Sequence, residues 1–348
     1  MDTYFLLMLI AYLLVSVSLA GTIYIFSHRW REPSKLRTCL ITLSVVGFTS
    51  VYLSLLLEYT FSAIFVTSDA HGLTLSSKAW KYKCWQPINE QGYRDEDHDE
   101  EDLESGNLLF VVGGSTAGAY GIDHGSKRFA NRLTEKIGDS WLAIVVAKIG
   151  WGVTDQLDAL RSYPKKPTLI ISSCTMDAIE PAATRNGFER PQLVDQPDGR
   201  FRWFVNHSFF FDWLYWRSYE GNAEQIYWDY LKDAHHNEEI WNTYKREIKD
   251  FIGYCKETKI EAVSVVWPHL CYIEESEEFT SKVVELLRNE GNKVLDLTKH
   301  FRGRNAEDLV VNSMDAHPNE KVHAEVAQLL YEMLEPWESS ERASVNSN

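Results

Sequence analysis

Three polar residues in this sequence have the types and the setting needed for nucleophilic catalysis. Ser115 lies in the glycine-rich segment GGSTAGAYG, directly after an apolar run that is typical of a buried strand. Asp315 and His317 lie near the C-terminus, just before an amphipathic segment. A serine hydroxyl becomes a nucleophile when a histidine takes its proton and a carboxylate orients that histidine. In an extended segment, residues two apart point the same way, so Asp315 and His317 could act together beside Ser115.

The glycine-rich turn does not fit the two common phosphate-binding patterns. A nucleotide-hydrolase loop needs G-x-x-x-x-G-K-[ST], and no lysine follows the glycines here. A dinucleotide fingerprint needs G-x-G-x-x-G, a spacing that GGSTAGAYG does not provide. A strand-to-helix turn also suits an exposed nucleophile, because its glycines let the backbone pass closely and a helix N-terminus stabilises an oxyanion. We therefore interpret Ser115 as a nucleophile and expect no cofactor.

Apolar runs alternate with amphipathic segments from residue 107 onward. Five of these runs have the length and the valine and isoleucine content of buried parallel strands: 107–113, 142–148, 168–173, 261–267 and 293–297. These predicted strands alternate with segments whose apolar residues have helical spacing. This pattern predicts a doubly wound, flavodoxin-like α/β/α domain over residues 107–337. Ligands of such sheets bind beyond the carboxyl ends of the strands, which is where the serine turn lies.

Residues 1–66 carry two apolar segments of membrane-spanning length. The first, 4–26, has 23 uncharged residues and the second, 38–57, has 20, and about 20 residues suffice to cross a hydrocarbon core. The loop between them, SHRWREPSKLR, holds all the basic residues of this region. The positive-inside rule predicts a two-pass anchor with this loop in the cytoplasm and with both termini and the α/β domain outside, on the periplasmic side in a Gram-negative cell. A cleaved signal peptide fits poorly, because the start lacks basic residues and the apolar run is too long.

Several segments lie around or within the α/β pattern. Residues 67–106 are expected to form a stem, with the acidic run DEDHDEEDLE as a solvated linker. Residues 180–238 form an aromatic-rich insert, which fits core packing, a lid or acyl-binding wall, an interface or a membrane-lying face. The tail, 338–348, is expected to be disordered. Glu58, at the end of the second apolar run, fits either an interfacial carboxylate or an intramembrane contact to a partner protein.

Charge and cysteine content argue against other classes of function. The 348 residues carry a formal net charge of −15, and such an acidic chain repels phosphate backbones, so no nucleic acid partner is expected. The five cysteines form no CxxC pair and show no metal-ligand spacing, so no metal centre is expected. Free buried thiols fit better than disulfides for the four cysteines outside the apolar segments, Cys84, Cys174, Cys255 and Cys271.

Four sequence blocks together resemble those of the SGNH (GDSL-like) hydrolases. They are VVGGSTAGAYG, KIGWGVTDQL, KPTLIISSCTMDAIE and DAHPNEKVH, and they follow the order and spacing of that family. The similarity covers roughly residues 80–335 and includes the segment WQPINEQGYRD, which is similar to the stem of membrane-anchored bacterial members. The resemblance implies an enzyme of the bacterial cell envelope that hydrolyses or transfers acyl esters.

The resemblance also implies a role for each site residue. Ser115 would be the nucleophile, His317 the general base and Asp315 the residue that orients it. Gly150 matches the glycine of the second block, whose N–H joins that of Ser115 in the oxyanion hole. The family usually has Asp-x-x-His in its last block, and the Asp-x-His of this chain is more similar to the extracytoplasmic acetyltransferases of alginate acetylation.

The third block departs from the family pattern. Its usual Gly-x-Asn-Asp is replaced by Cys-Thr-Met-Asp, so that Met176 occupies the position of the asparagine. A methionine side chain cannot donate a hydrogen bond to an oxyanion. Loss of one such donor costs about 10²–10³ in rate, whereas loss of the catalytic residues costs about 10⁶. We therefore expect a slowed or specialised enzyme.

Two functions from different classes fit these observations. The first is a serine esterase or O-acyltransferase that removes or transfers acetyl groups on a surface or secreted glycan, or acts on a small ester. The second is a weak or inactive SGNH-like module that serves as an assembly or binding subunit of a membrane complex, with its transmembrane helices contacting partner proteins. The serine, histidine and aspartate favour the first, whereas Met176, the aromatic insert and Glu58 favour the second.

Overall fold

The computed structural model describes residues 2–29, 34–195, 197–219 and 221–345, and the chain divides into two compact units. The first unit comprises Met1–Thr67, Leu73–Ala79 and Gln196–Tyr219, and the second comprises Ser68–Gly72, Trp80–Asp195 and Glu220–Asn348. The unit boundaries therefore pass through both the segment expected as a stem and the aromatic insert.

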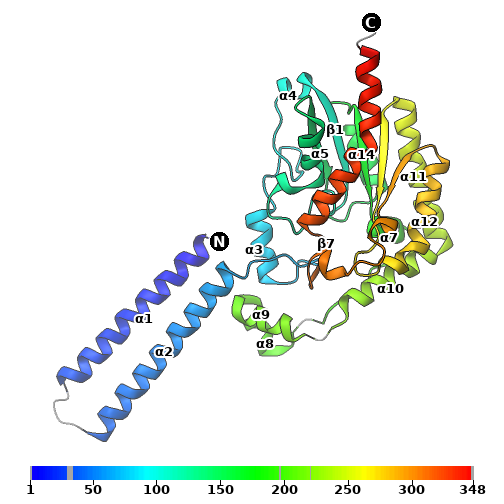
Figure 1. Ribbon diagram of the computed structural model, residues 1–348. Helices are drawn as coiled ribbons and strands as arrows, with labels where there is room; N and C mark the ends of the chain where they lie inside the picture. Colours follow the sequence, from blue (N-terminus) through cyan, green and yellow to red (C-terminus); the bar gives the residue numbers. More distant parts are fainter. Residues whose placement is uncertain (1, 30–33, 196, 220, 346–348) are drawn as a thin grey trace. The chain divides into compact units, whose positions relative to one another are not determined.

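A five-stranded parallel sheet in the order β2-β1-β3-β4-β5 forms the centre of the second unit (Figure 1). Each strand lies within one residue of its predicted position at either end: β1 Asn107–Gly113, β2 Trp141–Ala147, β3 Leu169–Cys174, β4 Glu261–Val266 and β5 Lys293–Asp296. This strand order is that of doubly wound, flavodoxin-like sheets. The predicted doubly wound α/β fold class is thus confirmed.

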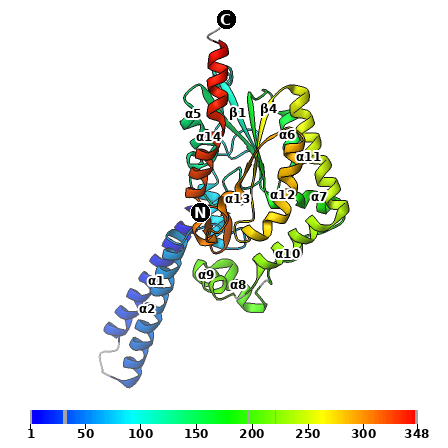
Figure 2. The same cartoon turned by 45° about the vertical axis from the view of Figure 1, so that its right-hand side comes forward.

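Helices cover both faces of this sheet (Figure 2). Alternate side chains of β1 point to opposite faces, so that Leu109 and Val111 join one core and Phe110 and Val112 join the other. The first core is closed by α5 Phe129–Ile137, α13 Leu297–Phe301 and α14 Glu320–Val345. The second is closed by α6 Val153–Ser162, α10 Ala223–His236, α11 Glu238–Thr258 and α12 Ile273–Asn289.

The register of the sheet brings the carboxyl ends of three strands to one edge. β1 pairs with β2 from Asn107↔Trp141 to Gly113↔Ala147, and its other side pairs with β3. The turns that follow β2 and β3 therefore lie on either side of the turn that follows β1. A separate antiparallel pair, β6 Val310–Asn312 and β7 Asp315–Pro318, precedes α14.

Short elements complete the second unit: α4 Glu100–Ser105, α7 Glu180–Arg185 and the 3₁₀ turns η1 Gly125–Lys127, η2 Met176–Ile179 and η3 Ala306–Asp308. α3, Leu75–Cys84, begins in the first unit and ends in the second. α14 continues to Val345 and so includes most of the tail that was expected to be disordered, while residues 346–348 lie outside the described residues.

The acidic run of residues 95–104 is not the fully solvated linker that the sequence predicted. Asp95, its first residue, is buried. Its carboxylate lies 2.7 Å from Arg128 Nη2 and accepts a hydrogen bond of 2.8 Å from the Val145 amide of β2. Asp99 instead caps the N-terminus of α4. The start of the run therefore belongs to the core of the α/β unit, because its carboxylate neutralises a buried arginine.

Among the described residues, the first unit contains the first half of α3 and four whole helices: α1 Asp2–Arg29, α2 Lys35–Ala63, α8 Gly199–His207 and α9 Phe209–Ser218. Residues Leu6–Phe26 and Lys35–Ala63 are long and apolar enough to cross a membrane. The basic loop between them was assigned to the cytoplasm, and its residues 30–33 lie outside the described residues. α8 and α9 are the part of the aromatic insert that groups with the apolar helices rather than with the sheet.

Candidate active site

The turn after β1 holds Ser115 at the carboxyl edge of the sheet. Gly113 is required at the end of the strand, because a Cβ there would lie 2.6 Å from Ala117 Cβ and 2.8 Å from Ser173 Cβ. The turn is closed by a hydrogen bond of 2.9 Å from the Tyr120 amide to the Ser115 carbonyl. Residues 115–121 form successive turns instead of the helix start that the sequence favoured, since Ala119 takes a positive φ of 57°. No helix N-terminus therefore follows Ser115 directly.

Asp315 and His317 of β7 reach this serine from the other end of the chain. His317 Nε2 lies 2.8 Å from Ser115 Oγ, and His317 Nδ1 lies 2.6 Å from Asp315 Oδ1. The His317 amide also donates to Asp315 Oδ1 over 3.1 Å, which fixes the carboxylate beside the ring. A neutral imidazole with its proton on Nδ1 would donate to Asp315 and accept from Ser115. The structure thus brings the three predicted residues together in the order serine, histidine, aspartate.

The electrostatic setting favours a charged pair of Asp315 and His317. Burial alone would lower the pKa of His317, but the Asp315 carboxylate outweighs it and holds that pKa above the ordinary value of 6.5. Burial alone would likewise raise the pKa of Asp315, but His317 and the hydrogen bonds to the carboxylate hold it below 3.8. Asp315 is fully buried, so its charge acts in a medium of low dielectric.

Ser68 is a fourth member of this hydrogen-bonded chain that the sequence did not indicate. Its hydroxyl donates to Asp315 Oδ2, the oxygen that His317 leaves free. Ser68 is itself buried, and its carbonyl accepts a hydrogen bond of 3.1 Å from Asn312 Nδ2. Both oxygens of the buried carboxylate are therefore satisfied and its orientation is fixed.

Arg94 supports the turn that carries Ser115 by hydrogen bonds to its carbonyls, and the sequence did not indicate this role. Its buried guanidinium donates to the carbonyls of Ala119 and Ile122 over 2.6 Å each, and to that of Cys84 over 2.6 Å. The guanidinium also lies 4.7 Å from the centre of the Trp85 ring. Burial lowers the pKa of Arg94 to about 10, so it remains charged at neutral pH. A single cation thus supplies partners for carbonyls that no helix or sheet satisfies.

The two predicted oxyanion positions lie on either side of Ser115. Gly150 is exposed in the turn after β2 and has a φ of 78°, which favours glycine. Met176 begins η2 as the second residue after the end of β3, and its side chain is buried in the core. Its carbonyl lies 3.1 Å from Nε2 of the buried His235, whose pKa burial lowers to about 4. The position of the family's asparagine is therefore taken by an apolar side chain that packs inward.

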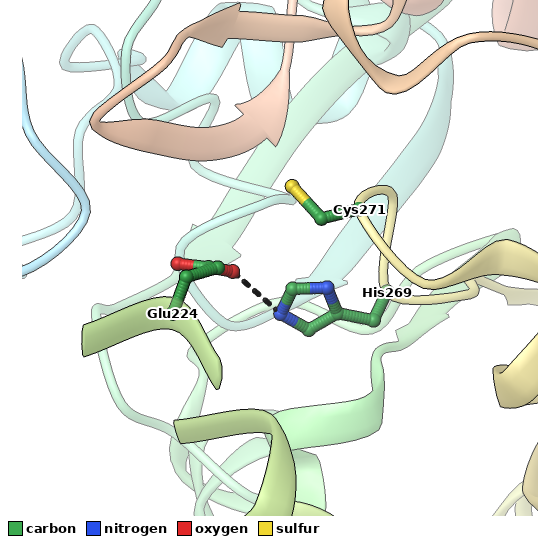
Figure 3. Close-up of side chains that lie close together, drawn as sticks. All are labelled: Glu224, His269 and Cys271. Atoms are coloured by element: carbon green, nitrogen blue, oxygen red, sulfur yellow. Dashed lines mark ion pairs between the residues drawn. The ribbon is translucent and has the colours of Figure 1, made fainter. Parts of the chain in front are cut away.

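Polar side chains next to the triad form a second group that the sequence did not indicate. Glu224 Oε1 and His269 Nε2 lie 3.0 Å apart, and the ligand atoms of these residues and Cys271 lie within 4.8 Å of one another (Figure 3). Within the described part of the chain, this is the group that could hold a metal ion. Burial raises the pKa of the Cys271 thiol to about 12, so without a metal the thiol stays protonated. The charge of Glu224 also helps to raise the pKa of His317, so Glu224 lies close enough to the triad to interact with it electrostatically.

The remaining cysteines and the second histidine of the last block take no part in this geometry. All five cysteines are free thiols, with Cys174 and Cys255 buried and Cys84 and Cys271 partly buried. His323 is fully buried, and its Nδ1 accepts a hydrogen bond of 3.2 Å from the Phe129 amide. Burial lowers the pKa of His323 to about 3, so this histidine is neutral.

This chain is similar, at low sequence identity, to several solved structures. No protein-family model and no curated protein matches it. It is similar to the psychrotrophic esterase EstA from Pseudoalteromonas sp., at 14% identity and a TM-score of 0.40, over 67% of this chain and 99% of EstA. It is also similar to the lipase/acylhydrolase from Enterococcus faecalis, at 11% identity and a TM-score of 0.41, over 66% of this chain and 95% of the other. A third similar protein, from Desulfitobacterium hafniense, is described as lipolytic and of the G-D-S-L family, at 10% identity and a TM-score of 0.42, over 65% of this chain and 98% of the other.

Proposed function

We propose that this protein is a serine esterase or O-acyltransferase, with Ser115 as nucleophile, His317 as general base and Asp315 as the residue that orients the base. One observation carries this proposal: the continuous path from Ser115 Oγ through both nitrogens of His317 to the buried carboxylate of Asp315. The geometry matches the requirement that nucleophile, base and orienting group each lie within hydrogen-bond reach of the next.

The proposed reaction proceeds in two acyl transfers. Ser115 Oγ attacks the ester carbonyl while its proton moves to His317 Nε2, and Asp315 stabilises the imidazolium that forms. The carbonyl oxygen becomes an oxyanion, for which the amides of Ser115 and Gly150 are the proposed donors. Collapse of this intermediate breaks the ester bond, and His317 returns the proton to the leaving alcohol. Water or a sugar hydroxyl then attacks the acyl-serine by the same steps in reverse order.

Polar groups near the triad support an acylated glycan as the substrate. Arg190 lies 4.4 Å over the ring of Tyr227 and 2.8 Å from His71 Nδ1. His71 and Glu224 interact electrostatically with each other, and both interact with His317. Aromatic rings and paired charged groups suit a substrate rich in hydroxyl groups better than an acyl chain of lipid length. A short acyl group such as acetyl on a sugar fits this surrounding.

The membrane anchor is the second part of the proposal. α1 and α2 would span the membrane, with the basic loop in the cytoplasm and the α/β unit outside, where glycans are assembled or exported. Partner proteins in the membrane could bind these helices. A non-catalytic binding subunit is the second candidate function, and the inward-packed Met176 is the observation that favours it.

The pH dependence of turnover follows from the raised pKa of His317. The base must be neutral to accept the serine proton, so kcat/KM should rise with pH through a pKa that lies above 6.5. Hydrolysis of p-nitrophenyl acetate by the full-length protein in detergent, measured across the acidic and neutral range, gives this pKa directly. A midpoint at or below 6.5 would contradict the proposed Asp315–His317 pair.

Removal of the Ser68 hydroxyl should slow the reaction without weakening substrate binding. Ser68 donates to a buried carboxylate, and a hydrogen bond to a charged group contributes about 1.5–3 kcal/mol. We expect Ser68→Ala to lower kcat by roughly 10- to 100-fold, which is this energy expressed as a rate, and to leave KM unchanged. Ser68→Thr keeps the hydroxyl and should restore most of the rate. Equal losses in both variants would mean that Ser68 only fills space.

Hydrolysis and transfer can be separated in one assay. The full-length protein is given p-nitrophenyl acetate with and without a neutral oligosaccharide, and both acetate and acetylated sugar are measured. An acyltransferase produces acetylated sugar at the expense of free acetate, whereas an esterase produces acetate in both cases. Absence of both products from folded protein would favour the binding subunit.

A further inference from the structure

Large apolar side chains are exposed on α8 and α9 of the first unit. Phe201, Trp203 and Phe204 of α8 are exposed by 45%, 61% and 43%, and Leu214 of α9 by 42%. In the described part of the second unit, exposed large apolar side chains are scattered along the chain instead of grouped on one short segment. A contiguous group of this kind marks a surface that meets a protein or a membrane.

Glu58 attaches α9 to the C-terminal part of α2. Its carboxylate accepts hydrogen bonds from Ser208 Oγ over 2.6 Å and from the amides of Phe209 and Phe210 over 2.7 and 3.3 Å. These amides belong to the first turn of α9, where a carboxylate is favourable for both hydrogen bonding and the helix dipole. Glu58 thus has a defined role inside the chain, which neither of its two sequence-based interpretations included.

Aromatic packing strengthens the same attachment. The ring of Phe61, one turn further along α2, lies 4.8 Å from Trp213 and 5.3 Å from Phe210. Phe65, just beyond the helix, lies 6.3 Å from Trp213. Because α2 ends at Ala63, these contacts fix α9 at the end of the apolar helix, which is the level of the headgroups if α2 spans a bilayer.

Basic side chains accompany the exposed aromatic ones. Arg200 and Arg202 of α8 and Arg217 of α9 are exposed, and Arg217 lies 5.3 Å from the centre of the Trp213 ring. Tryptophan and phenylalanine are favoured in the interfacial layer of a bilayer, and arginines extend from it to lipid phosphates. Amphipathic helices that combine aromatic and basic side chains lie in the plane of the membrane surface, and α8 is of this kind.

We propose that α8 and α9 are embedded in the headgroup layer of the bilayer leaflet at which α2 ends, with Phe201, Trp203, Phe204 and Leu214 in contact with lipid. This proposal rests on the proposed membrane-spanning role of α1 and α2, and it is independent of the catalytic one. It assigns this part of the aromatic insert to the membrane surface.

The test uses the full-length protein in nanodiscs that contain phospholipids with brominated acyl chains. Cys39, Cys84 and Cys271 are replaced by alanine, and a single new cysteine carries an environment-sensitive fluorophore. Trp203→Cys reports on α8, Leu53→Cys on the apolar helix α2, and Glu238→Cys on the exposed start of α11. Circular dichroism checks that each labelled variant is folded.

We expect the label at position 203 to be blue-shifted and quenched to an extent comparable with that at position 53, and the label at 238 to show neither effect. Quenching at 53 but not at 203 would overturn the surface proposal while leaving the membrane span in place. No quenching at 53 would overturn the span and the surface proposal together. A blue shift at 203 without quenching would mean that protein, such as a second copy of this chain, covers the surface, and would also overturn the proposal.

Discussion

Replacement of His317 by alanine should abolish ester turnover in a protein that remains folded. His317 Nε2 lies 2.8 Å from Ser115 Oγ, and no other histidine ring is hydrogen-bonded to that serine within the described residues. Without the base, the hydroxyl keeps its proton at neutral pH and is a poor nucleophile. Removal of the histidine from such a triad costs about 10⁶ in kcat. Initial rates with p-nitrophenyl acetate, measured for wild type and His317→Ala in the same detergent, give this ratio.

His300→Ala is the matched control for this variant. His300 is a partly exposed histidine of α13 that pairs with Glu325 over 2.7 Å. Surface substitutions of this kind change the free energy of unfolding by about 0.5 kcal/mol or less. His300→Ala should therefore stay folded, and its turnover should equal that of the wild type because the triad is intact. Turnover by His317→Ala within tenfold of wild type would show that another group activates Ser115, or that the measured activity does not come from this site.

The second large effect is expected from Arg94→Leu, and it concerns stability as well as rate. Leucine fills much of the space but leaves the carbonyls of Cys84 and Ile122 without their donor, while that of Ala119 keeps only the Ile122 amide at 3.2 Å. Each buried carbonyl without a partner costs about 1–3 kcal/mol, so we expect a loss of about 3 kcal/mol or more in the free energy of unfolding. For a unit of this size that corresponds to a fall in Tm of roughly 6–12 °C. Thermal unfolding followed by circular dichroism measures it.

Turnover should fall together with stability in Arg94→Leu, because the Ala119 carbonyl lies in the turn that carries Ser115 and the Ile122 carbonyl directly follows that turn. Arg161→Leu serves as control: this arginine is 55% exposed and pairs with Asp158 only over 3.6 Å. Exposed ion pairs contribute about 0–1 kcal/mol to the free energy of unfolding. We therefore expect only a small change in the Tm of Arg161→Leu and no loss of turnover. An unchanged Tm in Arg94→Leu would contradict the role assigned to the buried guanidinium.

The strands and the three central polar residues could be predicted because their signals are local. Buried parallel strands are short runs of apolar residues, and the carboxyl edge of the sheet follows from their direction. Ser115 is the second residue after such a run, and Asp315 and His317 alternate in β7, where two-residue spacing places their side chains together. That they meet Ser115 depends on the doubly wound topology, which the strand–helix alternation indicated.

Other features depend on contacts between distant segments, for which the sequence has no local signal. Ser68 and Arg94 lie in the segment expected as a stem, yet their side chains reach Asp315 and the serine turn. The attachment of α9 to Glu58 joins residues 150 positions apart. The helix that follows the serine turn begins only at Phe129, with α5, because the backbone conformations of Ala119 and Gly121, with φ values of 57° and 85°, are incompatible with a helix directly after Ser115.

The central claim is that Ser115 is an activated nucleophile, and labelling with a fluorophosphonate probe tests it most directly. Full-length wild type and Ser115→Ala are treated with the probe in detergent at neutral pH, and the modified peptide is identified by mass spectrometry. We predict a single adduct on Ser115 in the wild type and none in the variant. A folded wild-type protein that does not react, or a variant that is labelled as strongly as the wild type, would contradict the proposed serine mechanism.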